Sequence, residues 1–179
     1  MKKLIIAVAA ICSATILNAA AVGWTNAGLG NYKGNAYDVF VIGQNGVESI
    51  AQITEILGAG GDISSYAFGS GTVANNGTAN LLASSTSPQL GAGTYESFFV
   101  VFDSATPTEG SKYALVSGIA NQTQTIADTT AKITFGTANQ STFYANADNW
   151  KSYGSVPEPT SGLLMLLGMA GLALRLKRA

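Results

Sequence analysis

Carboxylates are the main groups with which this chain could carry out acid-base chemistry. Its 179 residues include no histidine, and the single cysteine is Cys12, near the start of the chain. Ser-His and Cys-His catalytic pairs, and zinc sites with histidine ligands, are therefore excluded. Glycoside hydrolysis needs only two carboxyl groups about 5 to 10 Å apart. The ten Asp and Glu residues leave that one reaction open.

The spacing of these carboxylates does not favour catalysis or metal binding. Glu48 and Glu55 share one face of an expected helix, roughly 10 Å apart by helical rise, and a solvated helix face accounts for them. Asp62 follows two glycines, but the alternating Asp/Asn loop with a closing Glu that binds calcium is absent. Turn formation explains Asp62 better. We expect no catalytic residue, no metal site and no cofactor.

Aromatic side chains offer a second kind of chemistry, because flat rings can stack on sugar rings. Trp24, Trp150 and Tyr153 lie near the two ends of the expected folded body. Packing in the core, or at a surface close to a membrane, explains the same residues. The sequence leaves both interpretations open.

The charge of the chain argues against a nucleic-acid partner. The formal net charge is −1, the isoelectric point is near 5.2, and basic residues cluster only at the two ends. Proteins that bind DNA or RNA need a basic patch to neutralise phosphates. Between the ends, residues 22–156 carry four lysines and nine carboxylates, a net charge of −5.

The first 21 residues have the layout of a secretory signal peptide. Lys2 and Lys3 precede a long apolar run, and three alanines at 19–21 follow it. We expect signal peptidase to cut after Ala21, with Ala19 and Ala21 as the small residues that it recognises. An uncleaved membrane anchor is the alternative, although polar residues interrupt the apolar run. Lipid attachment at Cys12 is disfavoured by the bulky Ile11 before it.

The last 24 residues contain three elements in a fixed order. Pro157-Glu158-Pro159 is followed by a 13-residue apolar run at 162–174 and then by the basic residues Arg175, Lys177 and Arg178. The run alone reaches about 20 Å as a helix, against a hydrocarbon core of about 30 Å. Flanking residues extend it to a transmembrane helix at about 160–175, and the basic cluster stays cytoplasmic by the positive-inside rule. A buried core helix is the alternative.

These three elements resemble the PEP-CTERM sorting signal of Gram-negative bacteria, over residues 156–179. In that family a membrane-embedded cysteine protease called exosortase is thought to recognise the Pro157-Glu158-Pro159 element. The resemblance implies export through the inner membrane, transient or stable anchoring by one helix, and a cell-surface or matrix destination, often with exopolysaccharide or biofilm. Proteins that share this tail have unrelated bodies, so it implies nothing about the fold of residues 22–155.

The body at 22–155 is expected to be mostly β. Aromatic and β-branched residues, separated by Gly, Pro, Asn and Ser, predict strands at 37–42, 66–74, 94–103, 112–119 and 131–136. In the segment 97–102, residues 98–102 are apolar at successive positions, which indicates a strand covered on both faces. Asn76-Gly77 predicts a type I′ hairpin turn between the 66–74 strand and a short strand at about 78–82.

One segment, residues 47–57, has helical instead of alternating periodicity. Glu48, Gln52 and Glu55 fall on one side, with apolar residues opposite. We expect Asn45 as the N-cap and Gly58 just beyond the C terminus. The expected architecture is therefore a single β-sandwich or β-rich sheet with one packed amphipathic helix, plus the C-terminal transmembrane helix.

Three functions are compatible with this sequence. The favoured one is a non-enzymatic component of the cell surface or extracellular matrix that signal peptidase and exosortase process. The second is a polysaccharide-binding module. The third, least favoured, is a carboxylate-based glycoside hydrolase.

Overall fold

A computed structural model describes residues 19–118, 121–136 and 139–154. The expected sorting signal at 156–179, with its transmembrane helix, lies outside these described residues, as does the signal peptide up to residue 18. Within the described ranges, no helix is long and apolar enough to cross a membrane.

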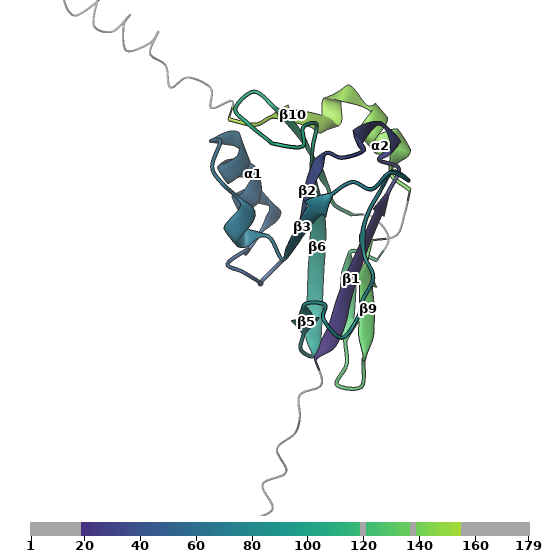
Figure 1. Ribbon diagram of the computed structural model, residues 1–179. Coiled ribbons are helices and arrows are strands. Elements are labelled where there is room, and N and C mark those ends of the chain that lie inside the picture. The colour runs from purple at the N-terminus through teal and green to yellow at the C-terminus, as the bar shows by residue number, and fades with distance from the viewer. Residues whose placement is uncertain (1–18, 119–120, 137–138, 155–179) are drawn as a thin grey trace, which may run out of the picture.

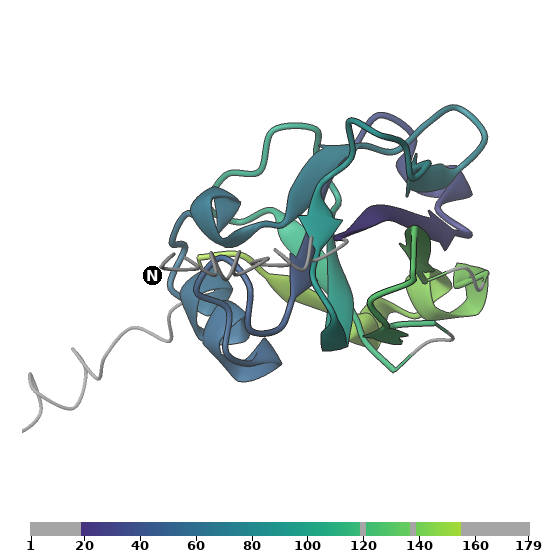
Figure 2. The ribbon, with the colours of Figure 1, turned by 90° about the horizontal axis from the view of Figure 1, so that it is seen from below.

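Two sheets and a helix form three layers. The first sheet is centred on β1 (Ala20–Ala27), which pairs with β4 (Thr78–Leu81) and β5 (Gln89–Leu90) antiparallel and with β9 (Lys132–Phe135) parallel. The second has the order β10 (Trp150–Ser152), β7 (Lys112–Val116), β6 (Gly93–Phe102), β2 (Ala36–Val41) and β3 (Gly69–Thr72). β8 (Thr123–Ile126) pairs with the first half of β6. Figure 2 shows α1 and the first sheet on opposite sides of β2 and β6. The expectation of a mostly β body is confirmed.

The second half of strand β6 is buried on both faces, as the sequence predicted. Every residue of β6 from Ser97 to Phe102 is buried. Phe99 and Val101 belong to the core between the two sheets, whereas Phe98, Val100 and Phe102 belong to the core beneath α1. Phe98 also stacks on Phe40 of β2, with ring centroids 5.0 Å apart. The second sheet is therefore the middle layer of the body (Figure 1).

Trp24 of β1 helps to close the core between the sheets. Its side chain is 4% exposed, and its indole Nε1 donates a hydrogen bond to the hydroxyl of Tyr37 at 3.3 Å. The ring lies so close to Gly69 of β3 that a Cβ there would come within 2.2 Å of it. Glycine at 69 is required by this close approach.

Helix α1 (Ile50–Gly58) confirms the expected amphipathic segment and corrects its caps. Ser49 is the N-cap, and its hydroxyl accepts the amide of Gln52 at 3.2 Å. Asn45 and Gly46 instead both have positive φ and form a tight turn closed by the Gln44 to Val47 bridge. At the other end Gly60 holds the left-handed position in place of Gly58. The amides of Gly60 and Gly61 bond back to the last turn, which is a Schellman motif.

The Asn76-Gly77 turn forms, but it does not join two paired strands. Gly77 has positive φ and Asn76 does not, so the turn is not type I′. The Asn76 side chain accepts a hydrogen bond from the amide of Thr78. The turn passes the chain from β3 in the second sheet to β4 in the first.

The remaining strand predictions are right in place and too long in two cases. The range predicted at 66–74 begins on the last residue of a 3₁₀ turn, Ser64–Tyr66, and only Gly69–Thr72 within it forms a strand, β3. In the range predicted at 112–119, strand β7 ends at Val116. The sequence did not predict the strands β1, β5, β8 and β10, the short 3₁₀ turns Gly30–Tyr32 and Ala147–Asn149, or the second helix, α2 (Ser141–Ala145).

The two-sided burial of β6 generates a stability prediction. Replacing either Phe98 or Phe99 by alanine should lower the free energy of unfolding by about 3 to 5 kcal/mol, because each substitution leaves a cavity in a different core. Glu96→Gln, at an exposed position of the same strand, should change it by less than about 0.5 kcal/mol. Chemical denaturation of the three variants provides the measurement. A mild effect at one phenylalanine would place that face of β6 in solvent.

Candidate functional site

The described chain enters and leaves the body at opposite ends. The first strand, β1, starts beside β5 at one end, and β10 lies beside α2 at the other (Figure 1). Ala19 lies just before β1, and Ala21 is the second residue of that strand. The sorting residues Pro157, Glu158 and Pro159 and the basic residues Arg175, Lys177 and Arg178 lie outside the described residues.

The N-terminal cleavage site lies within a paired strand. Ala20 and Ala21 face Leu90 and Gln89 of β5, and this is the pairing that holds β5 in the sheet. The amide of Ala21 also donates to the Ala131 carbonyl at 2.9 Å. Val22 is fully buried, and its amide donates to the carbonyl of Pro88 at 2.8 Å. Cutting after Ala21 would place a new ammonium group at this buried position, which is unfavourable.

This geometry predicts a difference between two starting points of the mature chain. A body that begins at Ala20 should be more stable than one that begins at Val22, by on the order of 2 kcal/mol, because the shorter chain loses the β5 pairing and buries a charge. Thermal unfolding of the two chains at equal pH provides the test. Equal midpoints would show that Ala20 and Ala21 contribute nothing to β1.

The C-terminal end of the body is fixed to the fold up to its last described residue. The hydroxyl of Tyr153 lies 3.2 Å from the carbonyl oxygens of both Gly60 and Gly61, and its ring packs edge-on against Phe102. The Gly154 amide donates to the carbonyl of Leu57 at 3.0 Å. Residues 153–154, here called the exit clamp, therefore hold the chain against the C terminus of α1.

Only Ser155 and Val156 separate the exit clamp from Pro157. Three Cα-to-Cα steps span at most about 11 Å. An enzyme that binds the Pro-Glu-Pro segment must therefore approach to within contact of the folded body, unless the exit clamp opens.

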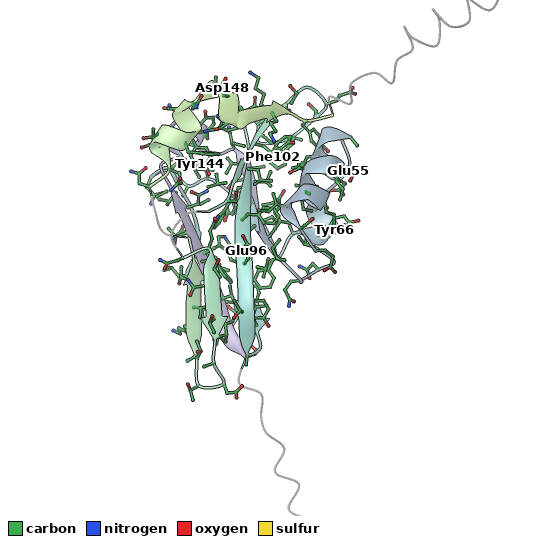
Figure 3. The ribbon with its side chains drawn as sticks, turned by 180° about the vertical axis from the view of Figure 1, so that it is seen from behind. Glu55, Tyr66, Glu96, Phe102, Tyr144 and Asp148 are labelled. Carbon is green, nitrogen blue, oxygen red and sulfur yellow. The ribbon has the colours of Figure 1, made fainter. Side chains whose placement is uncertain are left out.

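The carboxylates singled out in the sequence behave as surface groups. Glu48 and Glu55 are exposed, and Figure 3 shows Glu55 on the outer side of α1. The Asp62 carboxylate accepts hydrogen bonds from the amide and hydroxyl of Ser64, at 2.8 and 2.9 Å, which confirms the turn. These bonds lower the pKa of Asp62. Within the described ranges, no three His, Cys, Asp or Glu residues gather closely enough to hold a metal ion.

A carboxylate pair that the sequence did not predict lines a cavity beside the exit clamp. Asp38 of β2 and Asp62 share the wall of a cavity of about 420 Å³ with Tyr153. Burial raises the pKa of Asp38 to about 6, and the nearby charge of Asp62 adds to the rise. Asp38 lies among the apolar residues of β2. A carboxylate within an apolar strand was the sequence feature that could have predicted a partly buried acid at this position.

An aromatic cluster at the same end of the body forms the second candidate site. Tyr32 and Trp150 have ring centroids 4.6 Å apart, and Tyr144 of α2 lies 6.1 Å from each. The Tyr32 hydroxyl and the Trp150 Nε1 both donate to the backbone carbonyl of Tyr144, at 3.1 and 2.9 Å. Of the three aromatic residues noted in the sequence, Trp150 belongs to this cluster, whereas Trp24 is in the core and Tyr153 is in the exit clamp.

Two hollows adjoin this cluster, and Tyr32, Tyr144 and Ala145 line both. Their volumes are about 300 and 320 Å³. Beneath them, the amide nitrogen of buried Asn26 donates to the hydroxyl of Tyr144. The Asn26 Oδ1 is the one buried side-chain oxygen or nitrogen atom in the described part of the chain that has no hydrogen-bond partner.

Comparison with known proteins identifies the C-terminal tail. A family model for the PEP-CTERM protein-sorting motif matches residues 155–178. No curated protein and no solved structure matches the chain. Residues 155–178 therefore carry a PEP-CTERM sorting motif, which supports an exported, exosortase-targeted protein with a cell-surface or extracellular destination.

The raised pKa of Asp38 generates a pH prediction. Its folded-state pKa, about 6, lies above its ordinary value of 3.8, so ionisation destabilises the fold at high pH and this cost disappears as pH falls from about 6 to 4. Asp38→Asn should therefore stabilise the body by about 2 kcal/mol at pH 8 and by almost nothing below pH 4.

Urea denaturation across this pH range provides the measurement, with Asp62→Asn as the control. The control should lower the pKa of Asp38 by removing the neighbouring charge. A stabilisation by Asp38→Asn that did not depend on pH would contradict the assignment.

Proposed function

We propose that the body, residues 22–155, is a non-enzymatic component of the cell surface or extracellular matrix that associates with exopolysaccharide. The observation that carries the proposal is the sorting motif at 155–178, which follows directly from a folded, acidic, cysteine-free body. A surface rich in uncharged Ser, Thr, Asn and Gln suits a protein that works among neutral polymers outside the cell.

The proposed route has three steps. Signal peptidase removes the N-terminal segment, and the helix at about 160–175 holds the exported body at the inner membrane, with Arg175, Lys177 and Arg178 inside. Pro157 and Pro159 keep Glu158 in extended backbone, which a protease can bind. Exosortase then cuts at or near 157–160 and frees the body from the helix.

Mass spectrometry of the protein from its native host tests this route. We expect the mature chain to lack about the last 20 residues and to leave the membrane fraction. Glu158→Ala with both flanking prolines replaced should leave an inserted, uncut chain. A mature chain that ends at Ala179 and stays in the membrane, with exosortase present, would contradict the proposal and leave a simple single-span anchor.

The short link to the exit clamp adds a kinetic prediction. A flexible Gly-Ser linker of about ten residues after Gly154 should speed cutting several-fold, because exosortase then reaches the motif without opening the clamp. The same linker placed between Asp128 and Thr129, in the exposed turn after β8, is the matched control and should have no effect. Slower cutting with the first linker would mean that contact with the body assists the enzyme.

The carboxylate pair favours a second candidate function, a glycoside hydrolase. Asp38 has the raised pKa of a general acid, and Asp62 interacts with it across one cavity. A screen on chromogenic glycosides decides this point. Activity that Asp38→Asn abolishes would support the hydrolase and overturn the non-enzymatic proposal.

A further inference from the structure

We infer that the two hollows around Tyr32, Tyr144 and Trp150 bind a neutral oligosaccharide, with neighbouring sugar units in the two hollows. The inference rests on the proposed association with exopolysaccharide and names its site and the chemical class of its ligand. The pair of hollows is called the aromatic groove below.

The rings of the aromatic groove are held rigidly before any ligand arrives. Both hydrogen-bond donors, the Tyr32 hydroxyl and the Trp150 Nε1, are already engaged by the carbonyl of Tyr144. Both rings are nevertheless partly exposed. What they offer to a ligand is therefore flat apolar surface in a fixed position. Such a surface suits the C–H face of a sugar and requires little ordering on binding.

Polar groups at the rim complement the hydroxyls of a sugar. Exposed Asp103 and Lys112 line one hollow, and exposed Asn31 and Ser141 line the other. The Asp103 carboxylate is held in place because its Oδ1 accepts the backbone amide of Lys112 at 2.8 Å. Carboxylate, ammonium, amide and hydroxyl groups together can donate to and accept from neighbouring sugar hydroxyls.

The charges of the aromatic groove select a neutral ligand. Asp103 and Lys112 contribute one negative and one positive charge to the same hollow. The Tyr32 phenol is neutral at physiological pH, because its ordinary pKa is 10.0 and burial and the nearby Asp103 raise that pKa further. An anionic sugar would be attracted by the charge of Lys112 and repelled by the charge of Asp103, so it would gain little net electrostatic stabilisation. The volumes, about 300 and 320 Å³, each reach the lower end of the range for small-ligand sites.

The groove is assembled from segments that are distant in the chain. Tyr32 follows β1, Asp103 and Lys112 flank the loop between β6 and β7, and Tyr144 and Trp150 come from α2 and β10. Figure 3 shows Tyr144 at the end of the body where Phe102 terminates β6. The aromatic groove therefore lies at the same end as the exit clamp.

Fluorescence titration of the processed protein purified from its host tests the inference. The probes are laminarihexaose and cellohexaose, with hexagalacturonate as an anionic comparison. Trp24 and Trp150 are the only tryptophans, and Trp24 is buried. A ligand in the groove should therefore change the emission of Trp150. We expect at least one neutral hexasaccharide to bind more than fivefold more tightly than hexagalacturonate.

Surface variants make the site assignment specific. Asn31→Ala combined with Lys112→Ala should weaken binding at least fivefold without changing the unfolding midpoint, because both side chains are exposed. Lys151→Ala, on β10 next to Trp150 but outside the lining of either hollow, is the control and should bind as the parent does. Failure of both neutral hexasaccharides to bind, preference for hexagalacturonate, or equal binding by the double variant would overturn the inference.

A parallel assay separates this inference from the proposed function. Native exopolysaccharide from the host is immobilised, and retention of the parent and the double variant is compared. Equal retention of the parent and the double variant would contradict ligand binding in the aromatic groove but would leave the proposed association with exopolysaccharide intact. No retention of the parent would instead contradict the proposed association itself.

Discussion

The structure depends on one constraint, which is that the apolar run of β6 cannot be buried from one side. Phe98 to Phe102 are five consecutive apolar residues, and successive side chains of a strand point to opposite faces. One face therefore needs the first sheet, and the other needs α1. Phe99 and Val101 meet the β1 layer, while Phe98 and Val100 meet Ile53 and Leu57 of the helix layer. The first sheet and α1 each bury one face of this strand, and the body therefore has three layers.

The same arrangement fixes where the chain enters and leaves. β1 begins at the end of the body that carries β5, and the last strand, β10, ends beside the C terminus of α1. The carbonyls of Gly60 and Gly61, just after α1, accept the Tyr153 hydroxyl, and the carbonyl of Leu57 accepts the amide of Gly154. The helix therefore covers the core and also anchors the end of the described chain. The acidic cavity and the aromatic groove both lie at this exit end. The two candidate sites therefore lie at the end of the body where the described chain leaves the fold, away from the start of β1.

The sequence predicted the features that depend on local pattern. The unbroken apolar run at 98–102 predicted a central strand, and the 3.6-residue period at 47–57 predicted α1. The caps were wrong because Asn45-Gly46 also satisfies a tight turn, and Ser49 lies closer to the first helical residue. β1 was missed because Ala20 and Ala21 continue the alanines of the signal peptide, and Gly23 interrupts the strand pattern.

The aromatic groove could not be predicted, because its residues are far apart in the sequence and form no recognisable motif. They are Tyr32, Asp103, Tyr144 and Trp150. Asp38 and Asp62 are brought together only by the packing of α1 against the second sheet.

Native-state hydrogen exchange measures most directly whether β6 holds both layers together. The account predicts that the amides of Phe98, Val100 and Val101, together with those of Val22 in β1 and Ile53 in α1, exchange only through global unfolding. Their opening free energies should then be equal, and equal to the free energy of unfolding from denaturation. Independent exchange of α1 at a much lower free energy, with the β6 amides still protected, would contradict the claim that the helix layer and the sheet layers form one cooperative unit.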